Sequence, residues 1–437
     1  LNFSSKFNTL PLFEDWNPFI AFLCVKLKSS LIMLSRKLTI DKIPHLIKDK
    51  WVLMRVDFNV PIKEGKVADA TRIVSTLPTI DFLKKNGARS IILMSHLGRP
   101  DGQRIEKFTM KPTVGCLEDL LKTKVKFLSD CVGPDIEKTC IGSTAGEIIM
   151  LENVRFHLSE EGKGVINGEK VKASKDDIKA FRASLTKLGE IYVNDAFGTS
   201  HRAHSSMVGV DVQTRAAGFL LKKELEYFSK VLEKPDRPLA VVLGGAKVAD
   251  KIKLINNILN IANDVIIGGG MAFTFNKVLN GTKIGKSLFD EEGAKLVPDI
   301  IAKAKSKGVK IHIPSDFICS DTLDGKGTIV AWTEAQGIED NFLGLDIGEE
   351  TWKWFVEVLK GSKTVFWNGP QGVFEQEKFA KGSQALLNAI VEQTKANKMV
   401  SVIGGGDTVN LVNSVKGASE GISHISTGGG ASLELVE

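Results

Sequence analysis

The sequence has few cysteines, and their spacing fits neither a disulfide framework nor a zinc site. The five cysteines of the 437-residue chain include no Cys-x-x-Cys pair. An odd set of this kind favours reduced thiols and a cytoplasmic protein. The chain also lacks any run of five or six like charges, and its net charge is only +6 at pH 7. Nucleic acid is therefore not an expected partner. The apolar stretch at 19–25 is far too short to cross a bilayer, so we expect no membrane association.

Arginine is absent from residue 238 to the end of the sequence. All 11 arginines lie at or before Arg237, although lysine is plentiful throughout. Arginine offers a planar fork that suits carboxylate and phosphate groups, whereas lysine acts as a movable point charge. The two halves therefore predict two different anion sites. Any single arginine, taken alone, could equally be a solvated surface charge.

Glycine-rich turns follow four apolar runs in the second half. The runs are LAVVLGGAK (239–247), DVIIGGG (264–270), KTVFWNGPQG (363–372) and MVSVIGGGDT (399–408). β-Branched runs that alternate with helix-length segments are typical of parallel strands, and open α/β sheets bind ligands at the carboxyl ends of such strands. Glycine lets the backbone approach a phosphate closely, and the following helix offers unpaired N–H groups. The four turns predict a nucleotide site.

Polar side chains follow the predicted strands of the first half. Strands are expected within 51–61, 90–100, 148–156 and 191–198, with one helix at 71–87. The polar residues at their ends are Asp57, Asn59, His96, Arg99, Arg155, Asp195, His201, Arg202 and His204. Because successive strand ends meet on one rim of a sheet, these residues predict a shared binding site.

The whole pattern predicts an α/β protein with two doubly wound parallel-sheet (Rossmann-like) domains joined by a hinge helix. We place the first domain at 33–218, the hinge helix at 219–238 and the second domain at 239–427. Apolar residues at helical spacing and two closing prolines define the helix. Residues 1–32 lack this pattern, so we expect them to be an extension that is disordered or non-native.

Nine ordered sequence blocks resemble those of a known family. They are RVDFNVP, SHLGRP, LENVRF, NDAFGTSHRAHSS, GGAKVADK, GGGMAF, WNGPQGVFE, GGGDT and STGGGASLEL. In this order they resemble phosphoglycerate kinase over residues 37–437. The resemblance implies reversible phosphoryl transfer between 1,3-bisphosphoglycerate and ADP, giving 3-phosphoglycerate and MgATP, in a monomer that closes at its hinge. It also implies that 428–437 begins a C-terminal return segment that is truncated here.

The resemblance further implies which residues bind each substrate. For 3-phosphoglycerate it implies Asp57, Asn59, Arg72, His96, Arg99, Arg155 and Arg202. For the nucleotide it implies Gly244, Lys247, Lys251, Gly269, Gly344, Leu345, Asn368, Glu375, Gly405, Gly406, Asp407 and Thr408. Arg72, Lys247, Lys251 and Gly406 would stabilise the transferring group, and Asp407 would hold a Mg²⁺ cofactor. Both acceptor groups are ionised near pH 7, so catalysis needs positioning and cations but no general base.

Two other functional classes deserve comparison. The segments GGGMAF, GGGDTV and GGAKVA depart from the dinucleotide-binding fingerprint at or before its third glycine, which argues against a nicotinamide-dependent oxidoreductase. A non-enzymatic nucleotide sensor would share the glycine turns, but the arginines and histidines at the strand ends of the first half would then have no function. Formation of ATP from 1,3-bisphosphoglycerate and ADP distinguishes the enzyme from the sensor.

Five further residues have no substrate role in this scheme. His45, His157, His312 and His424 show no partner pattern, so we expect them to be structural or solvated. Gln371 stands within WNGPQG, where an apolar side chain is common in the family. We expect the backbone around it to matter more than its side chain.

Overall fold

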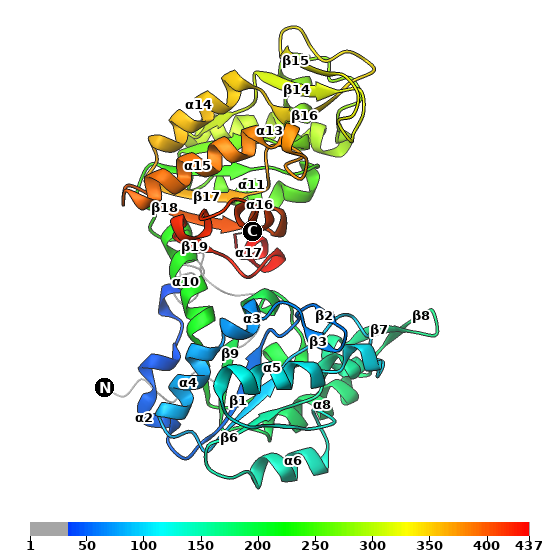
Figure 1. Ribbon diagram of the computed structural model, residues 1–437, viewed down its shortest axis with the longest axis vertical. Helices are drawn as coiled ribbons and strands as arrows, with labels where there is room; N and C mark the ends of the chain where they lie inside the picture. The colour runs from blue at the N-terminus through cyan, green and yellow to red at the C-terminus, as the bar shows by residue number, and fades with distance from the viewer. Residues whose placement is uncertain (1–33, 437) are drawn as a thin grey trace, which may run out of the picture.

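The computed structural model describes residues 34–436, which form two lobes joined by a helix (Figure 1). Residues 1–32, the expected extension, lie outside the described residues. Each lobe contains a six-stranded sheet in which all neighbouring strands are parallel. The predicted fold class is therefore confirmed. No helix within 34–436 has both the length and the apolar composition that a bilayer crossing requires.

The sheet of the first lobe has the strand order β10-β9-β1-β4-β6-β5. Its strands are β1 (Trp51–Val56), β4 (Ser90–Met94), β5 (Val125–Phe127), β6 (Glu147–Met150), β9 (Ile191–Asp195) and β10 (Thr214–Ala217). The helices of this lobe are α2 (Pro44–Ile47), α3 (Thr71–Val74), α4 (Leu77–Lys85), α5 (Lys111–Leu121), α6 (Pro134–Ile141), α7 (Leu158–Glu161), α8 (Lys175–Thr186) and α9 (Ser205–Val208). Val52 and Met54 of β1 pack with α4 and α5, whereas Leu53 packs with α6 and α8. The alternation of side chains along a strand thus supplies a core on both faces of the sheet.

The single helix expected at 71–87 is interrupted. Residues Thr71–Val74 form α3, and a new helix, α4, begins at Leu77. Pro78 lies in the first turn of α4, where proline's missing N–H is tolerated, whereas within a continuous helix it would remove a hydrogen bond. The break separates the short helix that carries Arg72 from the longer helix that packs on the sheet.

The sheet of the second lobe has the strand order β13-β12-β11-β17-β18-β19. Its strands are β11 (Leu239–Leu243), β12 (Asp264–Ile267), β13 (Lys310–His312), β17 (Thr364–Asn368), β18 (Val400–Gly404) and β19 (His424–Ile425). Its helices are α11 (Ile252–Ile258), α12 (Gly270–Asn280), α13 (Glu291–Lys307), α14 (Glu349–Lys360), α15 (Lys381–Lys395), α16 (Gly406–Ser414) and α17 (Gly430–Val436). Val241 of β11 packs with α11 to α13, and Val242 packs with α14 to α16. Both faces of this sheet are therefore covered as well.

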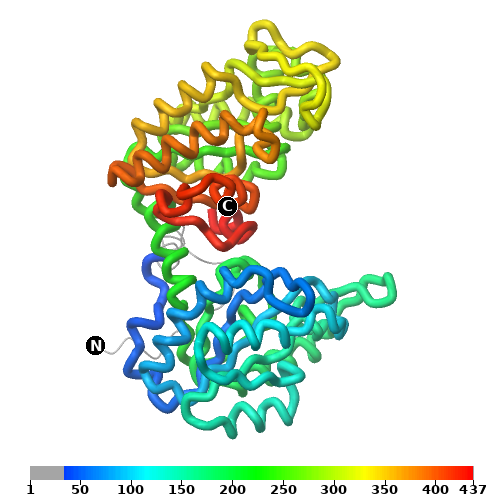
Figure 2. The backbone as a smooth tube through the Cα atoms, in the orientation of Figure 1, coloured from blue at the N-terminus to red at the C-terminus, as the bar shows by residue number. Residues whose placement is uncertain are grey.

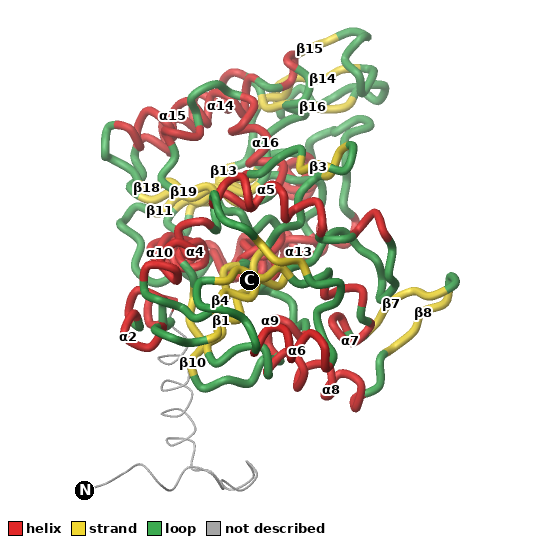
Figure 3. The backbone as a smooth tube through the Cα atoms, turned by 60° about the horizontal axis from the view of Figure 1, so that its bottom comes forward, coloured by secondary structure: helices red, strands yellow, loops and turns green. Residues whose placement is uncertain are grey.

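Three smaller sheets complete the fold, and none of them was expected from the sequence. An antiparallel sheet of order β15-β14-β16 joins β14 (Asp316–Ser320), β15 (Ile329–Thr333) and β16 (Leu343–Ile347). The hairpin β7 (Lys163–Ile166) with β8 (Glu169–Lys172) projects from the first lobe (Figure 3). A shorter hairpin pairs β2 (Ile62–Lys63) with β3 (Lys66–Val67). The β14 to β16 sheet forms one wall of a cavity between it and the glycine-rich turns.

The connecting helix α10 (Phe219–Leu232) is anchored in the first lobe by Asp195. The carboxylate of Asp195 accepts hydrogen bonds from the backbone N–H groups of Leu220 (2.9 Å) and Leu221 (3.2 Å). Burial raises the pKa of Asp195 to about 7. We had expected Asp195 on the binding rim, but it is fully buried and satisfies the free amides at the start of α10 instead.

The same helix is anchored in the second lobe by Glu224. This buried carboxylate accepts hydrogen bonds from the N–H (2.7 Å) and hydroxyl (2.8 Å) of Thr427 and from Nε2 of His424 (2.7 Å). The ring of His424 also stacks on Tyr227 of α10, with 4.7 Å between centroids. His424 is thus a structural residue, as expected.

The last described segment lies on the side of the second lobe that faces the first (Figure 2). A Cβ atom at Gly428 would lie 2.4 Å from the ring of Phe197, which belongs to the first lobe. In α17, the carboxylate of Glu434 lies 4.0 Å from Nε2 of His201. The two lobes are therefore in direct contact next to the connecting helix.

We predict that Glu224→Ala lowers the free energy of unfolding by about 2 to 4 kcal/mol, because it removes the shared acceptor of three donors, one of them on the buried ring of His424. Urea unfolding measures the change. Glu226→Ala is the matched control, since Glu226 is an exposed glutamate of the same helix whose ion pair with Lys222 is long, at 3.8 Å. The control should change stability by less than about 0.5 kcal/mol. An equal effect of both substitutions would contradict the anchoring role of Glu224.

Candidate active site

A cavity of about 790 Å³ lies between the two lobes. Its walls include Arg72 of α3, Glu224 of α10 and Gly406 at the start of α16. Arg72 and Gly406 are two of the four residues expected to act on a transferring group, one from each half of the chain. The fold brings them to the walls of one cavity.

Arg72 is held by Asp57 at the first-lobe side of this cavity. Its Nη1 donates to Oδ2 of Asp57 at 3.0 Å, and 41% of the arginine side chain is exposed. The ion pair with Asp57 partly explains why Arg72 is tolerated at the start of a helix, where the helix dipole disfavours positive charge. Asn59 lies beside Asp57, and its Oδ1 accepts from the N–H of Gly98 at 2.9 Å. One guanidinium edge of Arg72 remains available to an anion.

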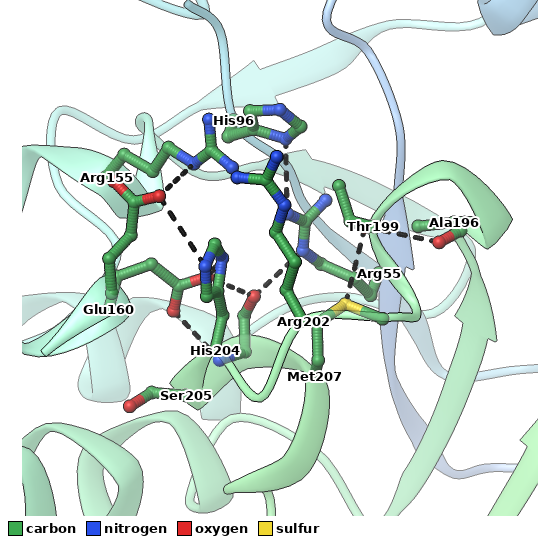
Figure 4. A network of polar contacts seen from close by, with 12 residues as sticks. Arg55, His96, Arg155, Glu160, Ala196, Thr199, Arg202, His204, Ser205 and Met207 are labelled. Carbon is green, nitrogen blue, oxygen red and sulfur yellow. Dashed lines mark hydrogen bonds and ion pairs between the residues drawn. The ribbon is translucent and has the colours of Figure 1, made fainter. Parts of the chain in front are cut away.

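His96 is buried next to a second arginine, Arg55, which is completely buried (Figure 4). The distance from Arg55 Nη2 to His96 Nδ1 is 3.2 Å. A guanidinium can only donate, so Nδ1 accepts and the proton of the neutral ring lies on Nε2. Burial and the charge of Arg55, with smaller effects from Arg155 and Arg72, hold the pKa of His96 well below its usual value. His96 is therefore a neutral hydrogen-bond donor.

The other predicted cations of the first lobe differ in burial. Arg155 is 4% exposed, and its Nη1 donates to the carbonyl of Gly98 at 2.9 Å. Arg202 is half-buried and donates from Nε to Nε2 of His201 at 3.1 Å. Arg99 is exposed, just beyond Gly98. Arg99 and Arg155 thus lie at the Gly98 turn at different depths, whereas Arg202 contacts His201.

Arg55 and its counter-ion, Glu160, were not among the residues predicted from the sequence. Arg55 Nε donates to Oγ of Ser206 at 2.9 Å, and that hydroxyl donates to Oε1 of Glu160 at 2.6 Å. Burial raises the pKa of Glu160, whereas burial and the nearby arginines lower the pKa of His204 to about 3. The available signal was an arginine inside the apolar run WVLMRV, a position that requires a buried partner.

On the second lobe, Lys251 contacts Asn368 at the carboxyl edge of the sheet. Nζ of Lys251 donates to Oδ1 of Asn368 at 2.6 Å, and burial lowers the pKa of Lys251 to about 8, with Asp407 opposing the shift. The Nδ2 group of Asn368 is buried and has no hydrogen-bond partner among residues 34–436. Gly405 adopts φ +87°, and a Cβ atom there would lie 2.6 Å from this amide nitrogen. The unpaired Nδ2 donor of Asn368 and the cation of Lys251 therefore lie together beside α16, in an arrangement that suits an anion.

Two of the predicted glycines of the second lobe, Gly269 and Gly344, line a cavity of about 450 Å³, together with other residues of β16 and of the loop after β17. Gly269 adopts φ +62°, which favours glycine. A Cβ atom at Gly344 would lie 2.2 Å from the ring of Phe273, so glycine is required for this packing. Leu345 also lines the cavity, whereas Gly244 lies under the Pro370 carbonyl with no room for a Cβ atom. The apolar lining suits a heterocycle.

The remaining predicted residues lie around these two cavities. Lys247 is exposed in the loop after β11, and Glu375 is exposed beyond β17. Asp407 is exposed in the first turn of α16, whose N-cap is Gly405, so Asp407 is not itself the N-cap. Thr408 is buried, and its hydroxyl accepts from the N–H of Gly369 at 2.7 Å. Thr408 therefore holds the loop that carries Asn368.

Another set of possible metal ligands, Asp130, Cys131 and His157, lies away from both cavities. His157 Nε2 lies 2.6 Å from Oδ1 of Asp130, so each satisfies the other. Burial and the nearby carboxylates raise the pKa of the Cys131 thiol well above its usual value. A protonated thiol is a poor metal ligand, and we assign this set a structural role.

Comparison with known proteins identifies the family. Residues 40–437 match the sequence profile described as phosphoglycerate kinase. A phosphoglycerate kinase from Euplotes crassus is 65% identical, over 93% of this chain and 97% of the relative. The human protein named phosphoglycerate kinase 1 is 54% identical, over 92% and 96% of the two chains.

Solved structures give the same result. Phosphoglycerate kinase from Coxiella burnetii superposes with a TM-score of 0.80 at 33% identity, covering 92% of this chain and 96% of the other. The enzyme from Pyrococcus horikoshii OT3 superposes with a TM-score of 0.69 at 29% identity, covering 91% and 95%. With sequence and fold in agreement, the chain belongs to the phosphoglycerate kinase family.

Proposed function

We propose that the two lobes divide the substrates of the family's reaction between them, with the phosphoglycerate on the first lobe and the nucleotide on the second. As a member of this family, the chain transfers a phosphoryl group reversibly between 1,3-bisphosphoglycerate and ADP. The observation that supports the division is the interdomain cavity lined by both Arg72 and Gly406. Formation of ATP from 1,3-bisphosphoglycerate and ADP tests the proposal, and nucleotide binding without turnover would favour a sensor.

The first-lobe residues suit a small molecule with a phosphate and a carboxylate. Arginine forks can bind either group at two points. The proposed ligand set is Asp57, Asn59, Arg72, His96, Arg99, Arg155 and Arg202. The neutral His96 would donate from Nε2, and Asp57 and Asn59 would bind the hydroxyl of the substrate. Burial of Arg55 and Arg155 beneath this surface fixes its geometry before the ligand arrives.

The second-lobe residues suit a nucleotide with its phosphates at α16. Lys247, Lys251, Asn368 and the backbone amides at Gly405 and Gly406 would bind the phosphates, because a helix N-terminus favours anions. Adenine would occupy the cavity between Gly269 and Leu345, with Gly344 beneath it and Gly244 supporting the loop, and Glu375 would bind the ribose. Thr408 would act indirectly, through the Gly369 turn.

A magnesium ion fits the second-lobe site. Asp407 offers an exposed carboxylate at the edge from which the phosphates would be reached, and Mg²⁺ is commonly held by one or two carboxylates together with substrate phosphates. When bound, the ion would neutralise phosphate charge. The chain's own residues position the acceptor oxygen and stabilise the transferring group through Arg72, Lys247, Lys251 and the Gly406 amide.

We also propose that the chain works in the cytoplasm as a monomer whose lobes close on the substrates. The reduced state of the four described cysteines is consistent with this location. The two substrates would bind on opposite walls of one cavity, so transfer needs the walls to approach and water to leave.

Arg72→Ala should reduce kcat by about 10² to 10⁴, with a much smaller change in KM, if Arg72 stabilises the transferring group mainly in the transition state. Arg72→Lys should restore only part of the rate, because the fork is lost. Arg89→Ala is the control, since Arg89 stacks on Trp51 at the opposite end of the sheet. Steady-state kinetics measure kcat and KM for the three variants. A folded Arg72→Ala protein with kcat within about tenfold of wild type would show that Arg72 does not stabilise the transferring group.

Asp407→Ala should abolish productive use of the magnesium nucleotide while leaving 3-phosphoglycerate affinity nearly unchanged, because the proposed sites lie on different lobes. Asp299→Ala, which removes an exposed carboxylate of α13, should behave like wild type. Kinetics at saturating Mg²⁺ and calorimetric titration of 3-phosphoglycerate provide the two measurements. Activity of Asp407→Ala within about threefold of wild type would exclude the metal role.

Small-angle scattering should show a monomer of 47.6 kDa that becomes more compact only when both substrates are bound. Each ligand alone contacts one wall of the cavity and gives no reason for closure. Samples with no ligand, each ligand and both ligands should be compared. Equal dimensions throughout, in an active preparation, would contradict closure.

A further inference from the structure

Gln371 has a buried side-chain amide without a hydrogen-bond partner. The residue is 2% exposed, and neither Oε1 nor Nε2 has a partner among residues 34–436. Its backbone is fully engaged, because its N–H donates to Oγ of Ser383 at 2.9 Å and its carbonyl accepts from Gly269 N at 3.1 Å. Native proteins satisfy nearly all buried polar groups. The amide therefore needs a partner that the chain does not supply.

The position of the amide relates it to the proposed nucleotide cavity. Gln371 lines the 450 Å³ cavity, whose other walls include Phe273, Pro314 and Phe317. Its Oε1 lies over Gly268 at the carboxyl end of β12, where a Cβ atom would approach it to 1.8 Å. Gly268 thus makes the space that the amide occupies. The donor and the acceptor lie together against Gly268 at the edge of a largely apolar slot, and a turn of the side chain would present them to a ligand there.

The chemistry of an amide selects the matching group on a ligand. A glutamine offers one carbonyl acceptor and one NH₂ donor side by side. The adenine ring carries the complementary pair, an exocyclic amino donor next to a ring nitrogen acceptor. The charged groups Lys251 and Asp407 lie at the other part of the nucleotide site, beside α16, so the apolar slot is left for the base.

We propose that Gln371 is a specificity-determining residue that hydrogen-bonds the amino-bearing edge of the purine. The inference rests on the proposed nucleotide site and deepens it. An apolar residue at this position, as the family resemblance led us to expect, would fill the slot without recognising that edge. A site that hydrogen-bonds a substrate group discriminates against analogues lacking the group, because its own polar atoms are then left unpaired.

Calorimetric titration with ADP and with purine riboside 5′-diphosphate, which lacks the amino group, tests the inference. Wild type should bind ADP roughly tenfold more tightly. Gln371→Met has a similar volume and no amide, so it should bring the two affinities within about twofold of each other. Gln371→Val provides a second amide-free variant if the first folds poorly.

Gln376→Met is the matched control, because the amide of Gln376 already donates to the carbonyl of Leu323 at 2.7 Å. It should keep the wild-type preference for ADP. A wild-type protein without that preference, or an unchanged preference in both Gln371 variants, would overturn the inference. Turnover of 1,3-bisphosphoglycerate with ADP is measured separately, so an inactive protein that still shows the loss of preference would refute the proposed function and leave the role of Gln371 standing.

Discussion

The hydrogen bonds of Glu224 are the interaction on which the relation between the lobes depends. The carboxylate belongs to α10, whose first amides are held by Asp195 of the first lobe, and it binds His424 and Thr427 of the second. One helix is therefore attached to both sheets by buried carboxylates. Such polar contacts are strongly directional, whereas apolar packing is not. They define how the carboxyl edges of the two sheets face each other.

The second constraint is electrostatic. The first lobe gathers several arginines at one edge of its sheet, and two of them are buried. Glu160 lies beneath Arg55, and Glu161 lies 3.4 Å from Arg155, so the buried charges are compensated on the inner side. His96 and His204 remain neutral because burial and the arginines lower their pKa values. The arginine-bearing edge of the first-lobe sheet is therefore positively charged at its surface, while its buried arginines are paired with glutamates.

The sequence predicted the parts of this arrangement that depend on local pattern. β-Branched runs ending in glycine located the sheet edges, because a buried parallel strand requires such a run. It did not predict partners that only tertiary structure creates. Glu160 and Glu224 look like ordinary helix-surface glutamates in the sequence, yet both are buried against groups 46 and 200 or more residues away. The burial of Asp195 was missed for the same reason. The break at Ser75 and Thr76 was missed although Pro78 supplied a local signal for it.

The glycine contacts between the lobes have a mechanical consequence. Gly428 touches the ring of Phe197, and Gly198 lies against Asp57 and within reach of the Thr427 carbonyl, with no room for even a methyl group at either glycine. These touching atoms cannot be compressed, so they act as a fulcrum beside α10. Displacement about a fulcrum grows with distance from it. A rotation that barely changes the contact at Gly428 would therefore carry the remote ends of the two sheets through a much longer arc, and an added methyl group there would force the Phe197 ring or the lobe itself to shift.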